Sequence, residues 1–373
     1  MSRIAIATDA WHPQINGVVT TLSNTIKELE VRGHEVLTIA PDPASWRSWS
    51  LPFDRDIKLE FLAKRRVRRD LEKFDPDYIH ISTEGPLGLA TRRFCLDTRR
   101  PFTTAFHTKF ADYVAIRLGT RFRHRVQEIF GARAADRSLA YVGDRALDFQ
   151  RWFHAPSGAI MVATDSIERE LANRRFRPPL VPWSRGVDTE QFRPYGKDFP
   201  PYAHLPRPIL EYMGRIEPEK NLPAFLDLET PGSKIVVGGG SFLGSLRSQY
   251  PAVHFTDQKT AADLGRHVAA ADIFVFPSKT DTFGLVILEA LACGLPVVAY
   301  PVAGPIDILG RESCRGFSRL DDDLGAAVHE MIDLWRRGAI DSDGARAHAL
   351  TYSWSEPTRQ FYENMRAHNS IAR

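Results

Sequence analysis

The sequence predicts an α/β protein built from two doubly wound domains, each a parallel sheet with helices on both faces. Short β-rich runs alternate with amphipathic segments, which is the pattern of parallel strands joined by right-handed crossovers. This alternation stops in a Pro- and Arg-rich stretch at residues 174–208 and then restarts. A chain of 373 residues is also too long for one ordinary hydrophobic core. We therefore expect two domains that face a central cleft, where chemistry would take place.

The first domain is expected to span residues 1–180. Its predicted strands are short, rich in β-branched and aromatic residues and bounded by turn residues; they cover residues 3–9, 35–40, 77–82 and 102–106. After the first strand, residues 18–33 place apolar side chains on one helical face, namely Val18, Leu22, Ile26 and Leu29.

The second domain is expected to span residues 181–355. Its predicted strands cover residues 208–213, 234–238, 272–277 and 296–299. The last residues, 356–373, are expected to form a helix after Pro357 that crosses back to the first domain.

The composition, 43% hydrophobic and 25% charged, is typical of a globular protein in water. The net charge of +3 is unevenly distributed. Residues 1–180 hold 29 Lys and Arg against 22 Asp and Glu (+7), whereas the remainder holds 20 against 24 (−4). This asymmetry suggests an anionic surface or ligand for the first domain, although a solvated charged face would look the same.

Cysteine usage and hydropathy favour a cytoplasmic protein. Cys95, Cys293 and Cys314 lie far apart without C-x-x-C spacing, so neither a disulfide framework nor a zinc site is indicated. The N-terminus lacks the apolar core of a signal peptide, and no uncharged apolar run reaches the ~18 residues of a membrane span.

Two loops that follow predicted strands suit a phosphorylated ligand, because ligands of open α/β sheets bind beyond the carboxyl ends of the strands. In residues 8–18, Gly17 would let a phosphate or sugar approach the backbone, although a plain N-cap and turn explains this segment equally well. In residues 213–222, the planar guanidinium of Arg215 and the ammonium of Lys220 suit the two phosphates of one diphosphate.

A third loop places charges inside the apolar run TDTFGLVILEALACGLPVVAY, where no core requires them. Asp281 and Glu289 are separated by seven residues, and their carboxylates can accept hydrogen bonds from sugar and ribose hydroxyls. Backbone amides at the start of the predicted helix can hold a phosphate; they belong to Asp281, Thr282, Phe283, Gly284 and Leu285. Taken alone, a helix cap and an exposed helix residue would explain the two acids.

Five segments in order resemble motifs of the retaining nucleotide-sugar glycosyltransferases with the GT-B fold. They are WHPQINGVVTTL, TTAFHTKFADY, RGVDTEQFRP, GRIEPEKNL and KTDTFGLVILEALACGLPVVAY. The resemblance extends over nearly the whole chain. It points to the group that includes bacterial phosphatidylinositol mannosyltransferases, sulfoquinovosyl and glucosyl diacylglycerol synthases and GDP-mannose-dependent mannosyltransferases. It implies two Rossmann-like domains and a UDP-sugar or GDP-sugar donor.

The resemblance also implies a role for each matching residue. Gly17 would lie under the diphosphate and sugar of the donor, and His107 would contact the sugar near the reacting carbon. Arg215 and Lys220 would stabilise the departing diphosphate, so that no metal ion is required. Glu289 would bind the ribose. The catalytic residues are therefore expected to be His107, Arg215, Lys220 and Asp281.

Two positions depart from the family pattern. Asp281, which would bind the donor sugar, is one methylene shorter than the usual Glu. Asp257 stands where relatives commonly have Gly, which leaves the choice of uracil or guanine open. The run at 236–240 lacks a full G-x-G-x-x-G fingerprint, and no cofactor is expected. Two Asp-x-Asp matches are interpreted as surface residues rather than metal ligands: Asp54/Asp56 and Asp75/Asp77.

The predicted function is transfer of a hexosyl unit, with retention, to a membrane lipid such as diacylglycerol or a phospholipid, as in glycolipid biosynthesis. The resemblance implies a same-face displacement in which the departing phosphate helps take the acceptor's proton. The alternatives are a transferase acting on a glycan or polysaccharide precursor, an NDP-sugar epimerase, and a binding module without catalysis. The presence of Arg215, Lys220 and Glu289 argues against the last.

Two basic segments, 61–74 and 117–130, motivate the lipid acceptor because each mixes cations with apolar residues. In the first, the apolar residues are Phe61, Leu62, Val67, Leu71 and Phe74. The cations expected to face the acceptor or an anionic membrane are Lys64, Arg65, Arg66, Arg68, Arg69, Arg121, Arg123 and Arg125. An ordinary solvated helix would show a similar pattern. We expect a monomer, peripheral on the inner face of the cell membrane, without a nucleic-acid partner.

Overall fold

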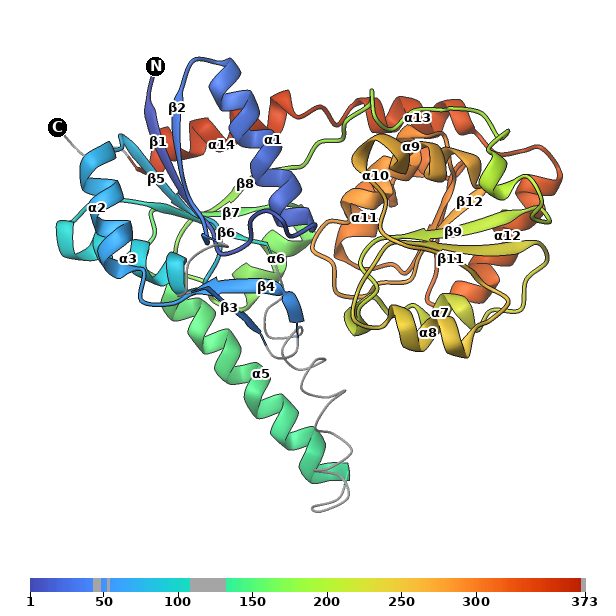
Figure 1. Ribbon diagram of the computed structural model, residues 1–373, viewed down its shortest axis with the longest axis horizontal. Coiled ribbons are helices and arrows are strands. Elements are labelled where there is room, and N and C mark those ends of the chain that lie inside the picture. The colour runs from blue at the N-terminus through green and yellow to red at the C-terminus, as the bar shows by residue number, and fades with distance from the viewer. Residues whose placement is uncertain (43–47, 52–53, 108–131, 370–373) are drawn as a thin grey trace. The chain divides into compact units, whose positions relative to one another are not determined.

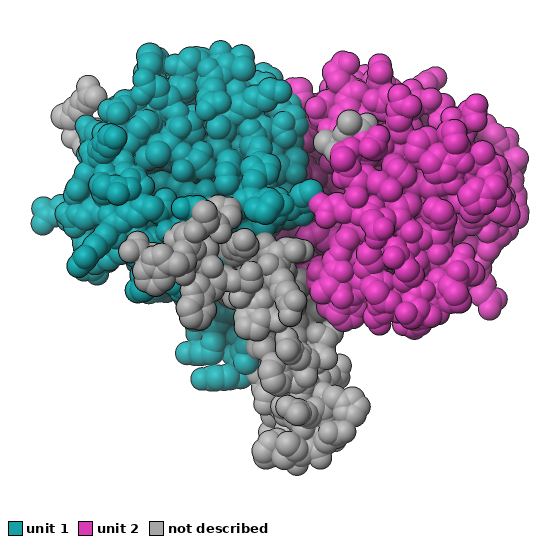
Figure 2. All heavy atoms as spheres, viewed as in Figure 1, with its two compact units in different colours: residues 1–114, 136–185, 354–373 teal, residues 115–135, 186–353 magenta. Residues whose placement is uncertain are grey.

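The computed structural model describes residues 1–42, 48–51, 54–107 and 132–369 (Figure 1). One compact unit comprises the described parts of residues 1–114, 136–185 and 354–373 (Figure 2). A second comprises the described parts of residues 115–135 and 186–353. Each unit contains a six-stranded sheet in which all strand pairs are parallel. The predicted fold class of two doubly wound α/β domains is therefore confirmed.

The first sheet has the strand order β2-β1-β5-β6-β7-β8. Its strands are β1 (Arg3–Ala7), β2 (Glu35–Ile39), β5 (Tyr78–Ile81), β6 (Thr103–Phe106), β7 (Ile160–Val162) and β8 (Leu180–Pro182). The four strands that the sequence predicts for this domain are present. The prediction missed β7 and β8, which have three residues each and show no alternating pattern in the sequence.

Helices cover both faces of this sheet (Figure 1). They are α1 (Gly17–Val31), α2 (Lys64–Phe74), α3 (Pro86–Thr98), α5 (Ala132–His154), α6 (Asp165–Asn173) and α14 (Ser355–His368). A separate antiparallel ribbon consists of β3 (Ser48–Leu51) and β4 (Asp54–Glu60). Ile4 of β1 packs in one core with Leu22 of α1 and Phe361 of α14, whereas the next residue, Ala5, packs in another core with Leu71 of α2.

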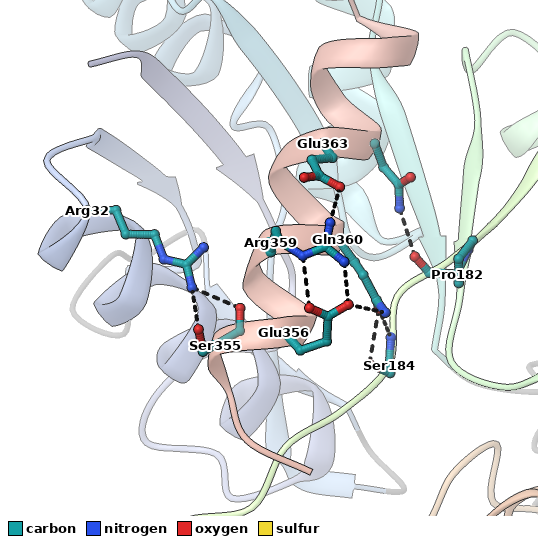
Figure 3. Close-up of polar contacts among 9 residues, drawn as sticks. Arg32, Pro182, Ser184, Ser355, Glu356, Arg359, Gln360 and Glu363 are labelled. Atoms are coloured by element: carbon teal, nitrogen blue, oxygen red, sulfur yellow. Dashed lines mark hydrogen bonds and ion pairs between the residues drawn. The ribbon is translucent and has the colours of Figure 1, made fainter. Parts of the chain in front are cut away.

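Helix α14 is held to the first unit by polar contacts (Figure 3). Arg32 of α1 donates a hydrogen bond to the carbonyl oxygen of Ser355 at 2.8 Å. The Oε1 atom of Gln360 accepts hydrogen bonds from the backbone nitrogen and the hydroxyl of Ser184 at 2.9 and 3.0 Å. The helix therefore packs with the first sheet although the second unit precedes it in sequence.

The second sheet has the strand order β11-β10-β9-β12-β13-β14. Its strands are β9 (Ile209–Met213), β10 (Ser233–Val237), β11 (His254–Thr256), β12 (Ile273–Phe276), β13 (Val297–Ala299) and β14 (Ser318–Leu320). The four predicted strands are again present, and the two that the prediction missed, β11 and β14, have three residues each.

The second unit also contains several short helices around its sheet. The α-helices are α7 (Pro223–Leu226), α8 (Leu243–Gln249), α9 (Ala261–Ala270), α10 (Leu285–Ala292), α11 (Ala303–Leu309), α12 (Leu324–Arg336) and α13 (Ser342–Leu350). The 3-10 turns are η1 (Pro200–Tyr202), η2 (Pro218–Lys220) and η3 (Glu312–Cys314). Leu210 of β9 and Val275 of β12 are fully buried in one core with Phe225 of α7 and Met331 of α12.

Candidate active site

The candidate site lies where the strand order of the second sheet reverses. The chain builds β10 and β11 on one side of β9 and returns with β12 on the other, so the loops after β9 and β12 leave neighbouring strand ends. Ligands of open α/β sheets bind at such reversals. The loop after β9 carries Arg215 and Lys220, and the loop after β12 carries residues 281–284.

Side chains connect these two loops directly. The side-chain amide of Asn221 donates a hydrogen bond to the carbonyl oxygen of Pro277 at 3.0 Å, and the Thr280 hydroxyl donates to the Glu219 carbonyl oxygen at 3.3 Å. Asn221 has a φ of +54°, a left-handed conformation that Asn tolerates better than most residues. Because of these contacts, residues about sixty positions apart in the sequence are held as one structure.

Both predicted cations have carboxylate partners in this structure. Lys220 Nζ lies 2.5 Å from Asp281 Oδ1, and Arg215 Nη2 lies 3.3 Å from Oε1 of the buried Glu219. Burial would raise the pKa of Asp281, but the ammonium of Lys220, together with Ser278 and the guanidinium of Arg215, outweighs burial and holds that pKa below its ordinary value. Asp281 is therefore ionised at neutral pH, and each cation is fixed in place by an anion.

A run of glycines after β10 lets the backbone approach the Arg215 loop closely. Gly238 has a φ of +144°, and a Cβ there would lie 2.0 Å from the carbonyl oxygen of Gly214. A Cβ on Gly240 would lie 2.3 Å from the carbonyl oxygen of Ile216, whose own amide donates to Gly239 at 2.8 Å. These glycines therefore serve close backbone packing beside the site.

Helix α10 begins at the end of the third predicted loop. Gly284 is its N-cap residue, with a φ of +92° that side-chain-bearing residues rarely adopt. A Cβ at this position would also lie 3.0 Å from Ile287 Cδ1 and 3.3 Å from Phe276 Cζ. No N-cap side chain bonds the first amides of α10.

The remaining residues of this loop differ in burial. Phe283 is buried, and its carbonyl oxygen would lie 2.1 Å from a Cβ on Gly304, so the loop packs tightly against α11. Thr282 and Leu285 are half-buried. Glu289, just over one turn further along α10, is half-buried, and burial raises its pKa to about 7.

The strand-order reversal of the first sheet lies between β1 and β5 and is arranged differently. The carboxylate of Asp9, after β1, accepts hydrogen bonds from the amides of Leu87 and Gly88 at 2.9 and 3.3 Å and from the Thr83 hydroxyl at 2.9 Å. Burial outweighs these hydrogen bonds and raises the pKa of Asp9 to about 6. The first turn of α3 is therefore occupied by a carboxylate of the chain itself.

Gly17 is exposed at the first position of α1. The preceding residue, Asn16, is the N-cap, and its side-chain oxygen accepts hydrogen bonds from the amides of Val18 and Val19, both at 3.0 Å. These two amides are already bonded, so a ligand over Gly17 would find a capped helix end.

His107 directly follows β6 and lies beside Arg185, which follows β8. Arg185 Nη2 lies 3.2 Å from His107 Nδ1. Burial, with a further contribution from Arg185, holds the pKa of His107 well below its ordinary value. His107 is therefore neutral at neutral pH.

Comparisons with known proteins identify the family. A model described as Glycosyltransferase Family 4 matches residues 15–191, and one described as Glycosyl transferases group 1 matches residues 207–336. A GDP-mannose-dependent alpha-mannosyltransferase of Mycolicibacterium smegmatis is 30% identical over 94% of this chain and 94% of its own. The chain belongs to the GT-B glycosyltransferases.

Two further comparisons agree with this membership. An alpha-monoglucosyldiacylglycerol synthase of Streptococcus pneumoniae is 26% identical over 88% of this glycosyltransferase and 78% of its own chain. The structure of sucrose-phosphate synthase from Thermosynechococcus elongatus has the same fold, with a TM-score of 0.73, 17% identity and coverage of 98% and 99% of the two chains. The resemblance predicted from the five motifs is therefore confirmed.

The basic segment 61–74 of the glycosyltransferase consists of α2 and the three residues before it. Its exposed cations are Lys64, Arg65, Arg68, Arg69 and Lys73. Arg66 differs, because its Nη2 atom lies 2.8 Å from the buried carboxylate of Glu60 and also donates to the Ala40 carbonyl oxygen at 3.0 Å. Arg66 therefore has a structural ion pair inside the first unit.

The apolar residues of this segment divide between the core and the surface. Val67 and Leu71 are fully buried in the first unit, so the expectation that they accompany the surface cations is corrected. Phe61 and Leu62 are exposed, by 45% and 77%. The second basic segment, with Arg121, Arg123 and Arg125, lies outside the described residues.

The Asp-x-Asp match at Asp75/Asp77 has structural partners. Asp75 pairs with Arg100, and Asp77 accepts a hydrogen bond from the Arg3 amide at 2.9 Å. Within the described ranges, no cluster of three or more His, Cys, Asp or Glu side chains could hold a metal ion.

Sequence reasoning missed three residues that contact the predicted ones or connect their loops, Arg185, Glu219 and Asn221, and it also missed Asp9 at the start of α3. Glu219 had a usable signal, because it lies four residues after Arg215 in a run that begins a helical turn. The other three act across strands, and only the strand order brings them to their partners.

Proposed function

We propose that this glycosyltransferase moves a hexosyl unit from an NDP-sugar to a hydroxyl of a membrane lipid, such as diacylglycerol or a phospholipid, with retention and without a metal ion. The bond between the anomeric carbon and the phosphate oxygen breaks, and a bond to the acceptor oxygen forms on the same face. The acceptor proton passes to the departing diphosphate. The observation that carries this proposal is the pair of fixed cations at the strand-order reversal of the second sheet.

In this proposal Arg215 and Lys220 neutralise the departing diphosphate, and the amides at the start of α10 bind its oxygens. Their carboxylate partners position the cations before the donor arrives, so that little side-chain entropy is lost on binding. Glu289 accepts hydrogen bonds from the ribose, and Asp281 accepts them from the donor sugar.

GDP-mannose is the donor to test first. The support is a relative that is 30% identical over 94% of both chains. The name of this relative specifies GDP-mannose. In the loop after β11, Asp257 is exposed and pairs with Arg247 at 3.2 Å. A guanine-specific enzyme should transfer mannose from GDP-mannose and transfer no glucose from UDP-glucose. Mass spectrometry of products from a panel of UDP- and GDP-sugars measures this preference.

A lipid acceptor is supported by the exposed cations of α2 and by the name of the relative that makes monoglucosyldiacylglycerol. No helix in the described ranges is both long and apolar enough to cross a membrane. Peripheral binding would then depend on surface charge, with about 1 kcal/mol per basic residue near anionic lipid.

Sedimentation with liposomes tests this membrane surface. Reversal of Lys64, Arg65, Arg68 and Arg69 to Glu should weaken binding to anionic liposomes by at least about 10-fold, because four favourable charges become unfavourable. Arg66 is left unchanged because its ion-pair partner Glu60 is buried, whereas the pairs of Arg68 with Glu72 and of Arg69 with Asp70 lie at the surface. The matched control reverses four exposed cations of the second unit, Arg311, Arg315, Arg336 and Arg337. Equal losses in both variants, or equal binding to neutral liposomes, would favour a glycan acceptor instead.

The reaction class is tested by incubating the purified protein with each donor, with and without a lipid extract. Acceptor-dependent consumption of the donor and an α-linked lipid product from an α-linked donor would support retaining transfer. An isomerised nucleotide sugar formed without any acceptor would favour the epimerase alternative. Failure of every donor to react with lipid or glycan acceptors would overturn the proposal.

A further inference from the structure

Arg185 is a buried cation whose hydrogen bonds go to carbonyl oxygens and to His107. It is only 4% exposed. Its Nη1 atom donates to the carbonyl oxygens of Trp183 and Ser184, the latter at 2.9 Å, and its guanidinium carbon lies 4.6 Å from the Trp183 ring centroid. In the part of the chain that the structure describes, no carboxylate forms an ion pair with it. This leaves Nη2 directed at the imidazole of His107, 3.2 Å from Nδ1.

The chemistry of the two groups fixes the proton on His107. A guanidinium has five N–H donors and no acceptor, so His107 Nδ1 must be the acceptor of this hydrogen bond. An imidazole whose Nδ1 accepts a hydrogen bond is neutral and carries its proton on Nε2. Burial lowers the pKa of Arg185 to about 9, which leaves the guanidinium charged at neutral pH.

The other titratable groups around this ring do not reverse this assignment. Among the residues that the structure describes, they are the imidazoles of His80 and His154. Burial lowers the pKa of His80 to about 3, so His80 is neutral at neutral pH. The Glu84 carboxylate accepts hydrogen bonds from His154 at 3.3 Å and from Gln150 at 3.0 Å, and both of these partners lie on α5.

We infer that Arg185 is a positioning residue that holds His107 as a neutral hydrogen-bond donor through Nε2–H. In the transfer reaction His107 then donates a hydrogen bond to a substrate oxygen and exchanges no proton. The inference rests on the proposed function only in assigning a sugar hydroxyl of the donor as that oxygen. The positive charge of Arg185 makes protonation of His107 unfavourable, which prevents an imidazolium from facing a sugar that develops positive charge.

Histidine-selective nitrogen NMR of the full chain tests the tautomer without any assay of activity. The His107 signals, identified by their loss in His107→Gln, should show a proton on Nε2 and none on Nδ1 from about pH 5 to about pH 8. A proton on Nδ1, or a protonation midpoint inside this range, would overturn the inference. This measurement tests the predicted tautomer of His107 even if no donor is ever found.

The variant Arg185→Met tests the assigned cause. His107 should then titrate within the same pH range. Turnover at saturating donor should fall by roughly 10- to 100-fold, as when residues that orient ligand histidines by hydrogen bonds are removed. The remaining turnover should decline further as the pH falls, because protonated His107 repels the developing positive charge. A variant with unchanged His107 signals would overturn the role of Arg185.

Arg92→Met is a matched control within the same unit. Arg92 is also buried, donates to the carbonyl oxygens of Phe153 and Trp152 at 2.9 and 3.0 Å, and lies 4.0 Å from the Trp152 ring centroid. Its loss should lower stability and leave the His107 tautomer and the pH profile unchanged. Equal changes in both variants would show that Arg185 acts only on stability. If Arg185→Met fails to fold, the wild-type spectrum still tests the inference.

Discussion

In both units a helix begins beside the strand at which the order of the sheet reverses, but different groups approach its start. In the first unit α3 follows β5, and Asp9 from the loop after β1 accepts hydrogen bonds from amides of the first turn of α3. In the second unit α10 follows β12, and the corresponding loop after β9 carries Arg215 and Lys220. At the strand-order reversal, the loop after the first strand therefore supplies a carboxylate in the first unit and two cations in the second.

This difference teaches which helix start is available to an anionic ligand. The partial positive charge of a helix N-terminus attracts any anion, including one from the same chain. In the first unit that anion is Asp9, whereas in the second the neighbouring cations favour an anion from outside. Net charge favoured the first domain instead, because the half of the sequence that contains these cations has a net charge of −4. The local placement of charges, rather than net charge, is therefore the basis on which we propose the phosphate site.

The largest expected effect comes from removing a cation of the second unit. Lys220→Ala should slow transfer by roughly 10- to 100-fold, because charge-assisted hydrogen bonds contribute about 1.5–3 kcal/mol. The loss also leaves Asp281 without its partner in a half-buried place. Steady-state kinetics measure the change, with the donor that the panel of UDP- and GDP-sugars selects, and EDTA should leave the wild type active.

Lys234→Ala provides the control for this substitution. Lys234 is a half-buried lysine of the same unit whose ammonium donates to the carbonyl oxygens of Leu226 and Leu228. Its removal should affect stability more than turnover. Equal rates for wild type and Lys220→Ala, or complete loss of activity in EDTA that magnesium or manganese restores, would contradict the metal-free assignment.

A smaller effect is expected at the two acids of the third loop. Glu289→Ala should weaken binding of the free nucleoside diphosphate by about 10-fold, because the ribose is present in that ligand. Asp281→Ala should mainly weaken the intact sugar donor. Calorimetry with both ligands separates these roles, and equal losses for both ligands at both positions would show that the division is wrong.

The raised pKa of Glu289, about 7, adds a pH dependence to this comparison. The carboxylate is the better acceptor for ribose hydroxyls and is lost as the pH falls through about 7, so nucleotide affinity should fall in the same interval. Glu289→Gln cannot ionise and should bind the nucleotide with a nearly constant affinity. Parallel pH profiles for the two proteins would indicate that another group titrates.

The fold was largely predictable because it depends on local patterns. The eight predicted strands show alternation or apolar runs, whereas the four missed strands have three residues each. The strand β13 is equally short, but it was predicted because it continues an apolar run after Pro296. Periodicity could have corrected one error, since Val67 and Leu71 lie four residues apart on the buried face of α2.

The site was only partly predictable, for a different reason. Arg215, Lys220, Asp281 and Glu289 stand in motifs that can be read along the sequence. The contacts that join their two loops depend on strand order: Asn221 and Pro277, for example, are 56 positions apart in the sequence and are hydrogen-bonded. Asp9 gave no local signal, because its partners Leu87 and Gly88 begin a helix after a different strand.

The smallest expected effect concerns this anion of the first unit. At about pH 4, where Asp9 is protonated in the folded state, Asp9→Asn should change the free energy of unfolding by only about 1 kcal/mol, because neither side chain then buries a charge. Burial raises the pKa of Asp9 to about 6, so ionisation is less favourable in the folded state than in the unfolded state. The wild type should therefore lose stability relative to the variant as the pH rises from about 4 to about 6, and not when it falls. Chemical denaturation of both proteins at several pH values measures this trend.

Nucleotide binding by the second unit should be unchanged at every pH, because Asp9 supplies the anion for the first unit only. A loss of nucleotide affinity in Asp9→Asn comparable to that of Glu289→Ala would contradict the division of roles between the two helix starts.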